Sequence, residues 1–296
     1  MTYLSIVRFI VGLSFLSVAA LMDIKTRRVT DKLWIVMAVV ALALLSIQLF
    51  NKEVGWRYYL IFIPIIVLLS EAFYEVPALF TDKGINFGVL TWFFIPVITV
   101  TYQIFSISDD IFFWSLLAIP IMMIIVFILY YFAILYGGAD AKAVLVLAIL
   151  VPFYPHIPGF THTGLVSQQI PFMQIMFPFT LIVLLNASII VLFILPVYLF
   201  INLKNKDFGF PQMLFGYRMD IENVSDSFVW PMERYNEDGE RTIKLFPRGD
   251  MDEVIETLRK RGLKRVWVTP KIPFIVPICI GYVISFLIGN PISYVL

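Results

Sequence analysis

The sequence has very few of the residues that build metal centres, disulfide frameworks and nucleic-acid surfaces. It contains a single cysteine, Cys279, and two histidines among 296 residues. One cysteine excludes a disulfide framework and a CxxC metal site, and we expect no metal or organic cofactor. Lys and Arg number 22 against 21 Asp and Glu, so there is no basic surplus to neutralise phosphates. We therefore expect no nucleic-acid partner.

Apolar residues are abundant instead. They make up 60% of the chain, and charged residues only 15%, whereas an ordinary soluble domain is about 45–50% apolar and about 25% charged. This composition predicts an all-α polytopic membrane protein with the lipid bilayer as its surroundings. About eight segments are candidates for transmembrane helices, of which the sixth is short and the seventh contains two prolines: 3–22, 33–50, 57–74, 87–105, 111–136, 140–154, 173–201 and 272–290.

One polar block, residues 202–271, interrupts this pattern before the last apolar segment. Its second half predicts a strand at 241–246, a helix at about 251–261 and a second strand at 264–269. Asp250 is the expected helix cap, and Gly262 the expected end. The predicted organisation is a helical bundle over 1–201, a small cytoplasmic α/β insert over 202–271 and a C-terminal transmembrane helix over 272–296.

The positions of the basic residues predict the orientation. If the N-terminus lies outside and the chain crosses eight times, all but three of the 22 basic residues fall on the cytoplasmic side. The loop at 23–32 alone carries four of them, which is the strongest signal because short loops dominate the positive-inside rule.

Two acidic residues stand out at predicted membrane boundaries. Asp23 closes the first apolar segment, and Asp140 opens the sixth after Gly137 and Gly138. Four predicted crossings separate them, and an even number returns the chain to the same face. Both carboxylates are therefore expected at the cytoplasmic boundary, where acidic residues are costly and usually functional.

Two facing carboxylates can hydrolyse a peptide bond without a metal or a covalent intermediate. Like charges a few ångströms apart do not both ionise readily, so the pair shares one proton. The ionised member then acts as general base on water, and the protonated member as general acid on the scissile carbonyl. Gly137 and Gly138 have no β-carbon, which would let a substrate backbone approach and permit a positive φ before the helix.

Other interpretations of the same residues remain open. Asp140 could serve only as a helix cap, and Asp23 could be a boundary charge balanced by Lys25 and Arg27. The acids could also carry protons in a secondary transporter, although the sequence contains no internal repeat and the acids do not lie at the midplane. A non-catalytic scaffold that presents residues 202–271 to a partner would need neither aspartate.

The two aspartate motifs resemble a known family. Asp-x-Lys-Thr-x-x-Val over 23–29, Gly-Gly-Ala-Asp-Ala-Lys over 137–142 and the segment 266–277 are similar to archaeal type IV prepilin and preflagellin peptidases, which are GxGD-type intramembrane aspartyl proteases. In this resemblance Asp23 and Asp140 match the catalytic pair, and Gly137 matches the first glycine of GxGD. Ala139 stands at the second glycine. An apparent inserted hairpin is formed either by the segments 57–74 and 87–105 or by 87–105 and 111–136.

The resemblance implies a membrane aspartyl endopeptidase of the cell membrane. Its substrates would be prepilin or preflagellin precursors, cut between a short basic leader and an apolar helix at the cytoplasmic boundary. Gly137, Gly138 and Ala139 would shape the approach of the substrate. Four polar residues would flank the pair and tune its protonation: Lys25, Thr26, Arg27 and Lys142. The choice of acid and base within the pair stays open, because the proton belongs to both.

Overall fold

The computed structural model describes residues 2–74, 77, 80–81, 84–135, 137–161, 170–236, 238–247, 249 and 251–289. The chain divides into two compact units. The bundle unit comprises Met1–Ser188 and Pro273–Leu296, and the insert unit comprises Ile189–Ile272. The first boundary between them precedes the one expected from composition at 201, because the last apolar helix before the polar block groups with the insert.

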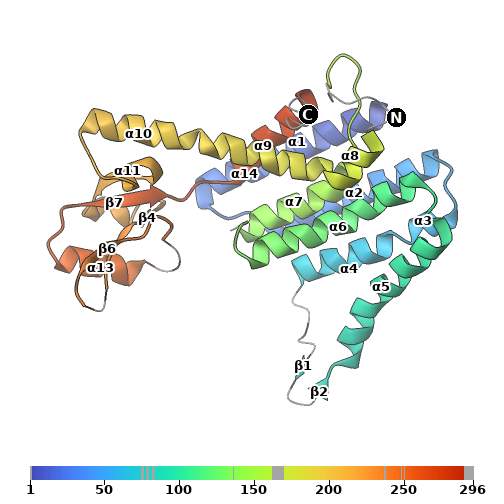
Figure 1. Ribbon diagram of the computed structural model, residues 1–296, viewed down its shortest axis with the longest axis horizontal. Helices are drawn as coiled ribbons and strands as arrows, with labels where there is room; N and C mark the ends of the chain where they lie inside the picture. The colour runs from blue at the N-terminus through green and yellow to red at the C-terminus, as the bar shows by residue number, and fades with distance from the viewer. Residues whose placement is uncertain are drawn as a thin grey trace. The chain divides into compact units, whose positions relative to one another are not determined.

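The bundle unit is almost entirely helical (Figure 1). Its only described strands are β1 (Phe80–Thr81) and β2 (Gly84–Ile85), which have two residues each and pair as an antiparallel hairpin. Its helices are α1 (Thr2–Thr26), α2 (Asp31–Asn51), α3 (Trp56–Tyr59), α4 (Phe62–Phe73), α5 (Phe87–Ile107), α6 (Ile111–Tyr131), α7 (Gly138–Leu150), α8 (Ile170–Met176), α9 (Phe179–Leu192, which enters the insert unit) and α14 (Ile275–Leu287). Most are apolar all round, as expected for helices that face lipid or a buried core.

The predicted fold class is confirmed: the protein is a mostly helical, polytopic membrane protein with a small sheet region before its last helix. Among the described residues, six helical stretches are long and apolar enough to cross a membrane, fewer than the eight expected. The difference lies in α7 and α14, which have 13 residues each. At 1.5 Å per residue they reach about 20 Å, short of a hydrocarbon core of about 30 Å.

Helix α7 lies at the centre of the bundle. Every residue from Ala143 to Leu150 is buried, and the helix contacts α1, α2, α6 and α14. A helix buried on all sides cannot show amphipathic periodicity, which is why its sequence resembles that of a membrane span. Its N-terminal turn carries Asp140, so the most enclosed helix of the bundle holds one of the two candidate residues.

Two glycines allow α14 to pack closely against its neighbours. A β-carbon at Gly12 of α1 would lie 2.3 Å from the Tyr282 hydroxyl, and one at Gly281 would lie 2.8 Å from the Val183 carbonyl oxygen of α9. The Tyr282 hydroxyl donates a hydrogen bond to the Arg8 carbonyl oxygen at 2.7 Å. Close packing of α14 along α1 places the first turn of α14 beside the last turn of α1, where Asp23 lies.

The insert unit combines short helices with antiparallel strands. It contains α10 (Ile194–Asn205), α11 (Gln212–Phe215), β3 (Tyr217–Asp220), α12 (Ile221–Val224), β4 (Val229–Pro231), β5 (Glu233–Tyr235), β6 (Arg241–Ile243), α13 (Asp252–Lys260) and β7 (Arg265–Pro270). The strand order of the larger sheet is β3-β7-β4, and β5 pairs with β6.

The strand, helix and strand predicted in the second half of the insert are confirmed as β6, α13 and β7. Gly262 ends α13 as expected, with a φ of 75° just after the helix. Asp250, the predicted cap, lies outside the described residues, and the residue that precedes the helix is Met251. β3, β4 and β5 have three or four residues and show too little alternation to be predicted. β6 is as short, but the alternating pattern continues beyond it to Phe246.

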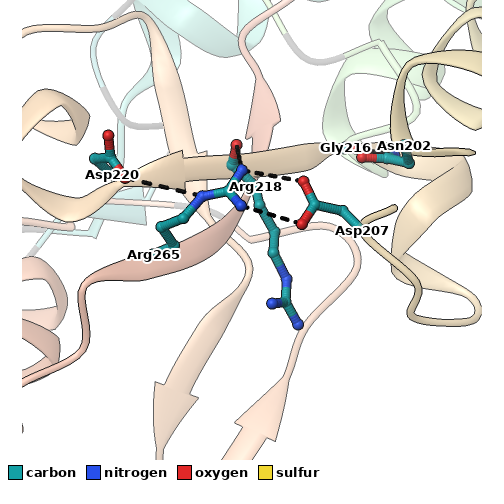
Figure 2. A network of polar contacts seen from close by, with 6 residues as sticks. All are labelled: Asn202, Asp207, Gly216, Arg218, Asp220 and Arg265. Carbon is teal, nitrogen blue, oxygen red and sulfur yellow. Dashed lines mark hydrogen bonds and ion pairs between the residues drawn. The ribbon is translucent and has the colours of Figure 1, made fainter. Parts of the chain in front are cut away.

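Polar contacts fasten the central strand of the insert to the end of α10 (Figure 2). Arg265 of β7 donates two hydrogen bonds to the buried Asp207 carboxylate, at 3.2 and 3.0 Å, and lies 3.8 Å from Asp220. The Asn202 amide donates to the Gly216 carbonyl oxygen at 2.7 Å. These contacts pair the buried Asp207 carboxylate and the Asn202 amide nitrogen, so we interpret the cluster as structural.

Candidate active site

Asp23 lies in the last turn of α1, where the helix is ended by local contacts. The Thr26 hydroxyl donates to the carbonyl oxygens of Met22 and Arg28, at 2.9 and 3.0 Å. Arg27 adopts a left-handed conformation with a φ of 54° and turns the chain toward α2. The Asp23 side chain is thereby held at the mouth of the bundle, partly exposed.

Asp140 lies in the first turn of α7, three residues after the N-cap Gly137. Its carboxylate accepts a hydrogen bond from the backbone N–H of Gly137, the contact that an acidic residue makes in a capping box. Asp140 therefore does cap α7, as one of the interpretations proposed, and this contact orients its carboxylate. The residue keeps partial exposure to the surroundings.

The structure explains the glycine at position 137 differently from the expectation. Its φ is −88°, and Gly138 is helical, so neither glycine supplies the positive φ that the sequence suggested. A β-carbon at Gly137 would instead lie 2.2 Å from the Asp140 Oδ2 atom. The Asp140 carboxylate occupies the space that a side chain at position 137 would need.

The start of α14 completes the site. The backbone N–H of Ile275, the first residue of α14, donates a hydrogen bond to the Asp23 carboxylate. The Asp140 carboxylate thus lies at the N-terminal end of its own helix. Asp23 belongs to the last turn of α1, and its carboxylate reaches the N-terminal end of α14. Free N–H groups and the helix dipole stabilise negative charge at both helix starts. The prolines before α14 predict where that helix begins, but the sequence offers no sign that its first N–H reaches Asp23.

The structure brings the two aspartates together. α1, α7 and α14 contact one another, and the Asp23 and Asp140 carboxylates repel each other electrostatically. The Arg27 side chain attracts Asp23 across the same turn. The site therefore contains two like charges that destabilise each other, held by helix ends that stabilise each of them.

The other flanking residues lie differently from the expectation. Lys142 pairs with Asp31 at the start of α2, with 2.6 Å between Nζ and Oδ1, so it ties α7 to α2. Thr26 caps α1, and the Lys25 side chain is exposed. Ala139 packs against the bundle core.

An apolar cavity of about 330 Å³ lies between segments that adjoin the site. It is lined by the end of α6, by the segment that leads to Gly137, by α9 and by Phe274, the residue before Ile275. Its lining is Leu129, Ile134, Leu135, Phe177, Leu181, Ile182, Leu184, Leu185, Ser188 and Phe274. Among the described residues no group of three or more His, Cys, Asp and Glu side chains could hold a metal ion.

Fold and site together define a helical membrane protein with two interacting carboxylates at the ends of α1 and α7. Residues 209–290 match the family model described as the archaeal peptidase A24 C-terminus, type II. This matched region covers most of the insert unit and α14, and it ends before the last residues of the chain.

Curated relatives extend the similarity to the rest of the chain. A preflagellin peptidase of Methanococcus maripaludis is 29% identical over 213 residues, which cover 68% of this chain and 85% of the relative. One of Methanococcus voltae is 25% identical over 97% of both chains. One of Methanocaldococcus jannaschii is 24% identical over 97% of this chain and 95% of the relative. The resemblance to archaeal preflagellin peptidases is thus confirmed.

Proposed function

We propose that the chain is a membrane aspartyl endopeptidase that removes the short basic leader from preflagellin or type IV prepilin-like precursors. The observation that carries the proposal is the electrostatic interaction of Asp23 with Asp140, at the adjoining ends of α1 and α7. Two interacting carboxylates that are partly exposed, beside helix N-termini, can supply the general base and the general acid for hydrolysis of a peptide bond. The relatives named preflagellin peptidase give the substrate class.

In the proposed reaction the pair holds one proton. The ionised carboxylate takes a proton from a water molecule, whose oxygen attacks the scissile carbonyl carbon, while the protonated carboxyl donates its proton to the carbonyl oxygen. Breakdown of the resulting intermediate returns a proton to the leaving amine. Each of these roles contributes about 10²–10⁴ in rate, and the pair rather than either residue owns the proton.

Gly137 positions Asp140, and Gly138 and Ala139 leave the approach to the pair free of large side chains. Arg27 attracts the Asp23 carboxylate. Lys142 has no direct part in this assignment, because it pairs with Asp31 at the start of α2.

We place the site and residues 202–271 on the cytoplasmic side of the cell membrane. The α1–α2 connection beside Asp23 carries Arg27 and Arg28, with Lys25 and Lys32 at its edges, and short basic loops face the cytoplasm. In a membrane-inserted precursor the junction between leader and apolar helix lies at this boundary. The bond to be cut and the two carboxylates of Asp23 and Asp140 are therefore at the same depth in the membrane.

The apolar cavity beside the site would accommodate the first apolar side chains after the cut. Leu185→Trp fills it from α9 and should raise KM about tenfold with little change in kcat, because it removes binding that ground state and transition state share. The control is Leu192→Trp, at an exposed position of the same helix outside the cavity. Equal KM values for the two variants would contradict binding of the substrate in this cavity.

A cleavage assay tests the proposed function. The purified chain in lipid would be mixed with a precursor that has a basic leader and an apolar helix, and with a copy whose leader Lys and Arg are Gln. We expect a new N-terminus at the leader–helix junction by mass spectrometry, and a slower reaction for the uncharged leader. Absence of cleavage, or cleavage inside the apolar helix, would contradict the proposal and favour a transporter or a scaffold.

A further inference from the structure

A buried arginine lies near the end of the bundle opposite to the two aspartates. Arg8 is 4% exposed and sits on α1, fifteen residues before Asp23. It lies about 9 Å of helix from the start of α1 at 1.5 Å per residue. Asp23, which we place at the cytoplasmic boundary, lies about 22 Å further along the helix. Arg8 therefore falls a few ångströms inside a hydrocarbon core of about 30 Å, where a guanidinium without a partner is costly.

The described residues do not neutralise this charge. No Asp or Glu of the described chain pairs with Arg8, and the one electrostatic partner that acts on it is the Tyr282 hydroxyl. Its Nη2 atom donates a long hydrogen bond to the Leu44 carbonyl oxygen at 3.4 Å. The buried Nε–H has no hydrogen-bond partner among the described residues. A buried charge of this kind calls for an anion.

A cavity of about 180 Å³ opens beside the guanidinium. Its lining comes from the start of α1, the end of α2, the segment after α7 and the end of α14. It is rich in polar groups for a membrane boundary, with Thr2, Ser5, Arg8, Gln48, Tyr154 and His156. The His156 backbone N–H donates to the Ser5 Oγ atom at 3.3 Å, which fixes the segment after α7 against α1.

We propose that this cavity binds a phosphate group, with Arg8 as its main ligand. Guanidinium N–H groups recognise phosphate oxygens through charge-assisted hydrogen bonds, and hydroxyl and amide side chains can complete the set. The phosphate is that of an anionic phospholipid headgroup, because the cavity is lined by the ends of membrane helices, from which an arginine side chain reaches the headgroup layer. The bound lipid would hold α1, α2, the segment after α7 and α14 together, far from the proposed catalytic pair.

Thermal unfolding of the purified full chain tests this site. In an uncharged, phosphate-free detergent, added phosphatidylglycerol should raise the apparent Tm of the wild type by about 5 °C. Arg8→Gln should reduce that rise to about 1 °C or less, and native mass spectrometry should show loss of the bound phospholipid. The matched control is Arg57→Gln, an exposed arginine outside the cavity, which should keep the full rise.

Further arms separate the sources of the phosphate. A galactosyl diacylglycerol, which lacks phosphate, should give no Arg8-dependent rise. If inorganic phosphate alone gives the whole rise, the lipid source is wrong. If Arg8→Gln keeps the same rise as the wild type, the site itself is wrong. Should Arg8→Gln fail to fold, Thr2→Phe narrows the cavity with Arg8 in place, and an undiminished rise in that variant would also overturn the proposal.

Discussion

Asp23→Asn and Asp140→Asn should each lower the rate of precursor cleavage by about 10³-fold or more. Asparagine keeps the size of the side chain and an oxygen that accepts the hydrogen bonds from Ile275 and Gly137, which orient the two carboxylates. It removes the titratable proton. Single-turnover cleavage, followed by mass spectrometry of the product, measures the loss.

A third aspartate near the site supplies the control for this prediction. Asp31 pairs with Lys142 at the start of α2, and its side chain is 52% exposed. Since exposed ion pairs contribute about 0–1 kcal/mol, Asp31→Asn should stay within about threefold of the wild-type rate. If Asp31→Asn loses as much activity as the other two variants, general charge at this end of the bundle is responsible, and the specific pair is not.

Gly137→Ala should lower cleavage about 100-fold while the protein still folds. The new β-carbon would lie 2.2 Å from Oδ2 and 2.8 Å from Cγ of Asp140, so the carboxylate has to move away. A displacement of about 1 Å of a catalytic group can cost about 10²-fold in rate. The variant is measured by the same single-turnover assay, with its unfolding temperature recorded alongside.

The matched control is Gly55→Ala. Gly55 is the N-cap of α3 as Gly137 is the N-cap of α7, and both have extended backbone angles that alanine also adopts. A β-carbon at Gly55 meets nothing within 4 Å. An equal loss of activity in both variants would point to a general effect of alanine at a helix N-cap. It would contradict the proposal that Gly137 is needed to leave room for the Asp140 carboxylate.

Hydropathy and crossing number predict much of this arrangement. Lipid imposes long apolar helices, so the boundaries of α1, α2, α5 and α6 could be estimated to within a few residues, apart from the C-terminal end of α6. Counting four crossings between Asp23 and Asp140 places both at one face. Their lateral approach depends on the packing of α1 with α7 and α14, which includes the close contact at Gly12, and no local pattern reports such long-range packing.

The details of the site needed the structure for similar reasons. Lys142 neighbours Asp140 in sequence, yet on α7 its side chain reaches Asp31 of another helix. The two glycines suggested unusual backbone angles, whereas Gly137 serves as space for a side chain. Ile275 contributes a backbone N–H, a group that every residue except proline carries and that sequence therefore does not distinguish.

The most direct test of the central claim is the double variant Asp23→Asn/Asp140→Asn, compared with both single variants and the wild type. Groups that act as one unit have strongly non-additive effects. Under single-turnover conditions at high enzyme concentration, the double variant should cleave no more than about threefold slower than the slower single variant. Multiplication of the two single losses, or wild-type cleavage by either single variant, would contradict a catalytic unit made of Asp23 and Asp140.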